Sequence, residues 1–192
     1  MRNKTVINED KKFEKINYTE KTLRNREFFQ CDFIRCNFTE SDLRGNTFED
    51  CTFENCNFSM TSIDGTGFRN VLFLDSKILG IDFSKCNEFM FSFKFENCLL
   101  DYSTFFRTKM QKTAFINCSL KQVDFSEVDL TSSLFTNSDL TGALFSRTVL
   151  EKVDFSNAQN FAIDPEQNSM KKAKFSANQL ESLLYKYDLT IL

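Results

Sequence analysis

The sequence predicts a column of stacked coils in which the chain turns a corner every five residues. Three observations support this prediction. Large apolar residues recur at every fifth position, small residues precede them by two positions, and Gly or Asn often follows them by two positions. A period of five matches neither an α-helix, with about 3.6 residues per turn, nor a flat strand, with about two. Each repeat therefore needs its own bend.

The large residue of each pentad, called here the central residue, follows two uninterrupted series. The first series runs from Phe13 to Phe83 and the second from Phe95 to Phe155, and the register jumps by two residues between them. The chain contains 24 Phe but no Trp and no His, so the abundant Phe needs a regular position. The central position of each pentad provides it, and the Phe side chains there should point into the column.

The positions on either side of the central residue complete the pattern. Gly or Asn follows the central residue by two positions in 11 of 28 pentads, and these residues tolerate the positive φ that a type II turn requires. Each pentad should therefore supply two inward side chains and one corner. The inward position two residues before the centre is small or apolar, and six of the seven cysteines occupy it: Cys31, Cys36, Cys51, Cys56, Cys98 and Cys118.

The pattern of a small residue, Asp or Asn, Leu or Phe, and two variable positions, as in SDLTG and VDFSE, resembles the pentapeptide-repeat family. The resemblance covers about residues 13–175. It implies an all-β fold, a right-handed quadrilateral β-helix with four pentads per coil. Residues one coil apart should then stack about 4.8 Å apart, with Phe33, Phe53 and Phe73 in one ladder and Cys31 over Cys51 in another.

The two ends of the chain depart from the repeat. Residues 1–12 are expected to form an N-terminal arm and residues 176–192 a C-terminal cap. Ser176 and Gln179 have the spacing of a capping box and predict a short helix, and the terminal DLTIL predicts a short strand. The helix either only closes the column, whose bare strand edges would be prone to pairing, or also contacts a second chain. Its apolar stripe is Leu180, Leu183, Leu184 and Tyr187.

The register break, over residues 84–94, is the other irregular segment. Phe89, Phe91, Phe93 and Phe95 occupy alternate positions around it, and two extra residues separate the two series. One interpretation is a β-bulge whose aromatic side chains pack inward. The other is an exposed aromatic patch that binds a partner.

The residue types argue against an enzyme, a metal site or a cofactor. Without His, a His-based catalytic triad and a His-ligated zinc site are both impossible. The cysteines occupy small inward positions on adjacent walls, which favours core residues over thiolate ligands. The recurring Asp residues occupy the repeat's own Asp or Asn position, so their recurrence is structural.

The sequence also predicts a cytoplasmic protein. No stretch approaches the roughly 20 apolar residues of a membrane span, and the N-terminus lacks the apolar run of a secretory signal. Seven cysteines, an odd number, fit a reducing compartment better than a disulfide framework.

The tail, with a loop containing Asp-Pro, final pentads, a short helix and an apolar end, resembles the quinolone-resistance and microcin-immunity subgroup, as does SKILGIDFSKC. That resemblance implies a DNA-mimicking protein that binds a type II topoisomerase, DNA gyrase or topoisomerase IV, and protects it from quinolones or peptide toxins. It implies no direct contact with nucleic acid. It also implies a homodimer formed through the C-terminus, with Leu180, Leu183, Leu184, Tyr187, Leu189 and Ile191 at the interface.

Charge is the remaining indication of a partner. Residues 27–64 hold eight acidic and two basic residues, although the whole chain carries a net charge of only −3. Because these acids should lie on all four walls, a solvated surface explains them about as well as a DNA-like stripe does. A general protein-interaction scaffold with an unrelated cytoplasmic partner is therefore the alternative function. The candidate partner-binding residues are Glu27, Asp32, Asp42, Glu49, Asp50, Glu54, Phe89 and Phe91.

Overall fold

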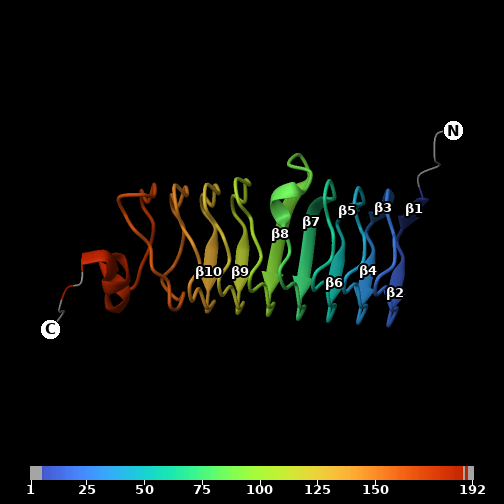
Figure 1. Cartoon of the computed structure of the whole chain (residues 1–192), viewed down its shortest axis with the longest axis horizontal. Helices are drawn as coiled ribbons and strands as arrows, with labels where there is room; N and C mark the ends of the chain where they lie inside the picture. The colour runs from blue at the N-terminus through green and yellow to red at the C-terminus, as the bar shows by residue number, and fades with distance from the viewer. Residues whose placement is uncertain (1–5, 188, 190–192) are drawn as a thin grey trace.

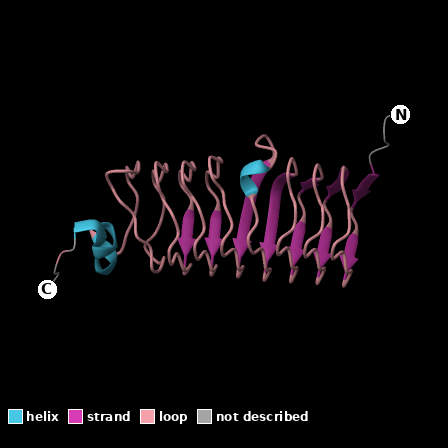
Figure 2. Ribbon diagram, in the orientation of Figure 1, coloured by secondary structure: helices cyan, strands magenta, loops and turns pink. Residues whose placement is uncertain are grey.

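The structure, a computed structural model, describes residues 6–187 and residue 189. These residues form one column, with β1 at one end and a small helical segment at the other (Figures 1 and 2). Every strand pair is parallel. The strands are β1 (Val6–Glu9), β2 (Lys12–Glu14), β3 (Arg26–Phe29), β4 (Asp32–Ile34), β5 (Thr47–Glu49), β6 (Thr52–Glu54), β7 (Gly67–Leu74), β8 (Phe91–Glu96), β9 (Ala114–Ile116) and β10 (Leu134–Thr136). The 3-10 helices are η1 (Phe83–Lys85), η2 (Ala177–Leu183) and η3 (Tyr185–Tyr187).

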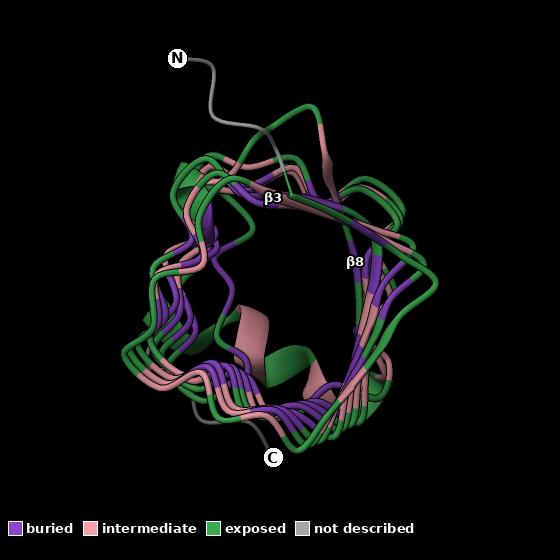
Figure 3. Cartoon of the chain, turned by 90° about the vertical axis from the view of Figure 1, so that its right-hand side faces the viewer, coloured by how far each residue is buried: buried purple, intermediate pink, exposed green. Residues whose placement is uncertain are grey.

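The chain winds as a right-handed, four-sided coil, which confirms the predicted fold (Figure 3). Wall 1 contains β1, β3, β5 and the starts of β7 and β8, and wall 2 contains β2, β4, β6, the ends of β7 and β8, β9 and β10. Walls 3 and 4 are held by single bridges, such as Asn37 to Asn57 and Asp42 to Ser62. The step from one coil to the next is 20 residues before the break, as in the pairing of Phe33 with Phe53.

The core of wall 2 is an unbroken stack of Phe rings. The predicted ladder is present, since the ring centroids of Phe33 and Phe53 lie 4.7 Å apart and those of Phe53 and Phe73 lie 5.1 Å apart. Each ring is nearly parallel to the next, and burying a side chain of this size stabilises a fold by about 2 kcal/mol. The whole stack is Phe13, Phe33, Phe53, Phe73, Phe95, Phe115, Phe135, Phe155 and Phe175.

The corners lie where the sequence places them, but they accept more residue types than predicted. Positive φ recurs two residues after the central residue along the column, from Lys15 (φ 54°) to Lys172 (φ 61°). Charged and aromatic residues occupy many of these corners, including Tyr102 (φ 64°). The closed ladders on the walls must therefore offset the cost of a left-handed backbone at residues other than Gly.

The coil begins before residue 13, so the expected arm over residues 1–12 is wrong for its described part. β1 pairs with β3, with Asn8 opposite Phe28. Asn8 is buried and takes the central position of the first wall, where its side chain donates to the Glu27 carbonyl and accepts from Lys11. A polar residue at this position hides the first pentad from a search for apolar periodicity.

The register break is a bulge with one projecting side. The pairing of β7 with β8 shifts between Phe68 and Val71, and residues 86–90, called here the break loop, extend beyond the outline of the column (Figures 1 and 3). Phe93 and Phe95 are buried, whereas Phe89 is 86% exposed. The inward and outward interpretations of the aromatic residues therefore each hold for part of the segment.

A glycine next to the bulge shows how tightly the break loop is seated. Gly67 is the one Gly that does not lie at a corner with positive φ. A Cβ atom added to it would lie 3.0 Å from the Cβ of Met90, the last residue of the break loop. The absence of a side chain at residue 67 therefore lets Met90 lie against wall 1.

The C-terminal segment covers the end of the column with 3-10 turns. The amide of Gln179 donates to the Ser176 carbonyl, and the amide of Leu184 donates to the Glu181 carbonyl, both three residues apart. The predicted capping box is wrong, because the Ser176 side chain caps no backbone amide and the Gln179 side chain donates to the Ala158 carbonyl of the last coil. The predicted terminal strand lies largely outside the described residues. Within the described part, no helix has the length and apolar character needed to cross a bilayer.

Candidate interaction surfaces

The six acidic candidate residues lie on three walls and one corner. Glu27 and Glu49 lie on wall 1, Asp32 and Glu54 on wall 2, and Asp42 on wall 4. Asp50 lies at the corner between walls 1 and 2, with φ 52°. The structure therefore brings the six carboxylates into the same two coils but onto no common face.

Asp42 is partly neutralised by cations on the neighbouring pentads. It accepts hydrogen bonds from Arg24 and from Arg44, whose Nη2 lies 2.8 Å from the carboxylate. Arg24 lies one coil earlier on the same wall, so the pair bridges two coils. The net charge of this part of wall 4 is therefore lower than the sequence composition suggests.

Two other candidate carboxylates also have partners. Arg69 Nη1 lies 3.1 Å from Glu49 Oε1, one coil further along wall 1. Asn70 Nδ2 donates to Asp50 Oδ1 over 2.6 Å. Exposed contacts of this kind contribute little to stability, but they set how much negative charge the surface presents.

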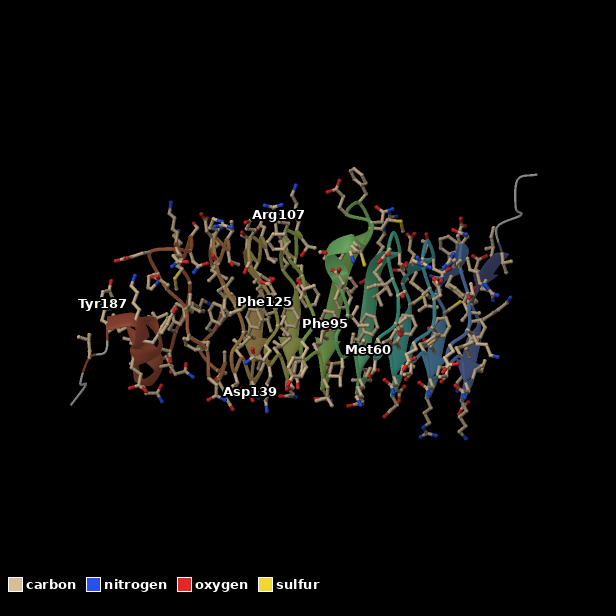
Figure 4. All side chains as sticks on the ribbon, viewed as in Figure 1. Met60, Phe95, Arg107, Phe125, Asp139 and Tyr187 are labelled. Carbon is tan, nitrogen blue, oxygen red and sulfur yellow. The ribbon has the colours of Figure 1, made fainter. Side chains whose placement is uncertain are left out.

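The break loop and the next coil enclose a hollow of about 380 Å³. Its lining includes Phe89, Phe91 and Cys86 on one side and Arg107, Thr108 and Lys109 on the other. Figure 4 shows Arg107 at the outer edge of the column on the side from which the break loop projects. The sequence pattern gave no indication of Arg107 and Lys109, because Arg107 occupies a corner and Lys109 occupies the Asp or Asn position of an ordinary pentad.

The C-terminal candidates divide into exposed and packed residues. Leu180, Leu184 and Leu189 are exposed, whereas Leu183 packs against the core of the column. The Tyr187 hydroxyl donates to Glu166 over 2.8 Å, which fixes the ring to the preceding loop. Ile191 lies outside the described residues.

An ion pair fastens this segment to the last loop of the column. Lys186 Nζ lies 2.9 Å from Asp164 and 2.6 Å from Glu166. Hydrogen bonds from Lys186 and from the Glu166 amide outweigh the other influences on Asp164 and lower the pKa of its carboxyl. The cap is therefore held by charge as well as by the contact of Leu183 with the core.

The cysteines lie in the walls with their thiols turned toward backbone carbonyls. Burial raises the pKa of Cys51 to about 12, so its thiol stays neutral. The thiol of Cys56 donates to the carbonyls of Phe33 and Glu54. Among residues 6–187 and 189, no cluster of three or more His, Cys, Asp or Glu side chains has the arrangement of a metal site.

Comparisons with known proteins agree with the coil geometry. The family profile described as a pentapeptide repeat region matches residues 26–105 and 108–184. Two solved structures of trypsin-treated variants of QnrB1, a plasmid-mediated fluoroquinolone resistance protein, each cover 98% of this chain and 98% of their own. One has 20% identity and a TM-score of 0.56, and the other has 19% identity and a TM-score of 0.58. No curated protein matches the sequence. With the repeat, the four walls and the profile in agreement, the chain belongs to the pentapeptide-repeat family.

Proposed function

We propose that this protein is a non-catalytic, cytoplasmic DNA mimic that binds a type II topoisomerase, DNA gyrase or topoisomerase IV. By occupying the enzyme's DNA-binding surface, it would protect the enzyme from quinolones or from peptide toxins. The observation that supports this proposal most is the end-to-end likeness in fold to a fluoroquinolone resistance protein, over 98% of both chains.

The density of negative charge near the N-terminal end, rather than its placement on one face, supports a DNA mimic. The carboxylates of residues 27–64 recur over about two coils, which span about 10 Å at the strand spacing. DNA carries one negative charge per about 1.7 Å of its axis, so a net charge of −6 over this length approaches the density of DNA. A positively charged cleft would attract such a surface over long range.

The exposed leucines of the C-terminal segment support a homodimer. Leu180 is 47% exposed and Leu189 is 58% exposed, and both lie at the end of the column. Joining two columns end to end through these residues would cover the apolar side chains and double the length of the rod. A two-fold contact of this kind uses the same surface on both chains.

The test uses the purified full-length protein with DNA gyrase and with topoisomerase IV. Added protein should restore DNA supercoiling by gyrase, or decatenation by topoisomerase IV, in the presence of ciprofloxacin, or should inhibit either reaction without the drug. The proposal is wrong if neither enzyme responds in either assay.

A charge-reversal pair locates the contact. Asp32→Lys with Glu54→Lys reverses two carboxylates on wall 2 and should weaken the effect by at least tenfold. Glu151→Lys with Asp101→Lys makes the same change in charge outside this block and outside the C-terminal segment, and should leave the effect within about twofold. Equal losses in both pairs would show that only the net charge matters.

A general interaction scaffold is the second candidate. The pairing of Asp42 with Arg24 and Arg44 favours it, because these ion pairs reduce the acidic charge that a DNA mimic needs. Recovery of one defined partner that is not a topoisomerase from native cytoplasm, in a complex that survives purification, would support this function.

A further inference from the structure

The parallel ladder of wall 1 is interrupted at Lys109. On this wall the backbone amide of one coil normally donates to a carbonyl of the preceding coil. The amide of Asp129 donates to the Thr108 carbonyl over 3.0 Å, and that of Val149 donates to the Val128 carbonyl over 2.9 Å. Within the described residues, the amide of Lys109 donates to no acceptor.

The carbonyl groups of the same rung are unpaired as well. The Asp129 carbonyl accepts from the Met110 amide over 2.8 Å, and the Val149 carbonyl accepts from the Leu130 amide over 2.9 Å. The Lys109 carbonyl has no such donor among the residues that the structure describes. Within the part of the chain that the structure describes, the backbone amide and carbonyl of Lys109 are therefore both unpaired, whereas the equivalent residues of the later coils on wall 1 pair both groups with the preceding coil.

The other walls continue without a gap past the same coil. On wall 2, Lys94 of β8 pairs with Ala114 of β9. On wall 3, Leu99 pairs with both Lys77 and Ser119. Wall 4 continues in the same way through Thr104. The gap on wall 1 therefore lies between Lys109 and the break loop, whose Asn87 amide and Met90 carbonyl, within the described range, bond only to the preceding coil.

The hollow of about 380 Å³ lies at this gap, a volume within the range of sites that bind small ligands and peptide segments. Phe89 and Phe91 provide apolar surface on one side, and Phe89 is 86% exposed. Below the hollow the core is already closed, because the Phe93 side chain is buried. An occupant must therefore lie along the wall, with its backbone toward Lys109 and its side chains outward.

The charges around the hollow favour an acidic occupant. Arg107 Nε donates to Glu127 over 2.6 Å, and its guanidinium lies 4.7 Å from the centre of the Phe106 ring. Lys109 is exposed and forms no ion pair with any residue that the structure describes. Glu88 is the one acidic residue in the lining, against two cations.

We propose that the gap binds an extended acidic peptide segment of a partner protein, which adds to wall 1 as one parallel rung. A peptide carbonyl would accept from the Lys109 amide, and the peptide amide two residues later would donate to the Lys109 carbonyl. Val128 and Leu130 make this pair of bonds to Val149 one coil further on. An acidic side chain between those two peptide residues would lie beside Lys109, as Asp129 lies beside Val149. Proteins commonly recognise peptides by adding a strand to an unpaired edge.

The probe is the capped peptide Ac-Glu-Val-Asp-Leu-Thr-NH2, which repeats the sequence of residues 127–131. In the free full-length protein, the Lys109 amide should exchange with solvent at least a hundredfold faster than the Asp129 amide, measured by NMR. Millimolar peptide should slow the exchange at Lys109 several-fold and leave Asp129 unchanged. Equal protection of the two amides in the free protein would show that the gap is closed in solution and would overturn the proposal.

Two controls separate backbone pairing from simple charge attraction. A peptide methylated on the Leu nitrogen keeps every side chain but loses the donor to the Lys109 carbonyl, and it should bind at least tenfold more weakly. Lys109→Glu should weaken binding of the unmodified peptide about three- to fivefold or more, whereas Lys112→Glu at the nearby corner should not. Equal binding of both peptides, or no response at Lys109 with 10 mM of either, would overturn strand addition. These measurements need no topoisomerase, so they succeed or fail independently of the proposed function.

Discussion

The Phe93 ring lies 5.3 Å from the ring of Phe68, the last central residue of wall 1 before the break. Phe93 occupies a position that is small elsewhere on wall 2, since its neighbours in the ladder are Val71 and Thr113. It also packs edge-on against Phe83 at 5.5 Å. A large side chain at a small position thus fills the space that the break loop leaves empty.

Replacing Phe93 should expose that space. Phe93→Ala should lower the free energy of unfolding by about 3–5 kcal/mol, because the change removes a buried ring and leaves a cavity. Urea unfolding followed by circular dichroism measures the change. Phe89→Ala, at the exposed tip of the same segment, should stay within about 0.5 kcal/mol of the parent. A small loss at Phe93 would mean that the coils close over the gap without it.

Asn117 links three corners through side-chain amides. Its Nδ2 donates to Asn97 Oδ1 over 3.0 Å, and its Oδ1 accepts from Asn137 Nδ2 over 3.2 Å. Asn117→Ala should destabilise the column by about 1–2 kcal/mol, since it removes both bonds and leaves a less suitable residue at φ 52°. Asn117→Gly should recover part of this loss, because Gly accepts the left-handed backbone. The same loss in both variants, measured by urea unfolding, would assign the whole effect to the side-chain bonds.

Asp139 should make stability depend on pH in the acid range. Partial burial alone would raise the pKa of its carboxyl, but hydrogen bonds from Thr141 and Asn160 and the nearby Lys121 outweigh burial and lower the pKa to about 2. The unfolded value is about 3.9. This contribution to stability is therefore fully present above pH of about 4 and is lost as the pH falls through about 2.

The variant Asp139→Asn should flatten the dependence of the melting temperature on pH between about 4 and 2. Thr141→Val removes one donor, whose hydroxyl lies 2.6 Å from Asp139, and should flatten the same curve in part. An unchanged slope in Asp139→Asn would assign the acid sensitivity to other carboxyls.

The C-terminal leucines should control the oligomeric state. Leu180→Asp should convert a dimer into a monomer in light scattering coupled to gel filtration, because it places a charge in an apolar contact. Leu99→Asp is the matched control, since Leu99 is also 47% exposed but lies on wall 3. A dimer that survives Leu180→Asp would exclude this leucine from the interface.

The regular part of the fold is readable from the sequence because each wall repeats one local rule. The central residues, the small inward positions and the corners all follow from a period of five, and Phe33 stacks on Phe53 as the period predicts. The first pentad was not predicted because its central residue is Asn8, a polar residue. Its side chain is buried with hydrogen bonds to the Glu27 carbonyl and to Lys11. Burial at that position depends on the next coil, which no local pattern contains.

The candidate surfaces were less predictable, for a different reason. The pairing of Asp42 with Arg24 joins residues on successive coils, and its effect on surface charge appears only when the coils are stacked. The gap at Lys109 depends on backbone groups that the side-chain pattern does not report. The capping box failed because Gln179 reaches Ala158 on the last coil instead of the start of its own helix.

The interruption of wall 1 also bears on how the column yields under force. Three hydrogen-bonded walls join the coils beside Lys109, and three also join them earlier in the column, where Ser62 and Asp82 on wall 4 form no bridge. Because each coil contacts only its neighbours, a pull along the axis is transmitted through every junction in turn. The junctions beside Lys109 and beside Asp82 have fewer bonds than the regular junctions, so the rod should part at one of these two places into an N-terminal and a C-terminal segment.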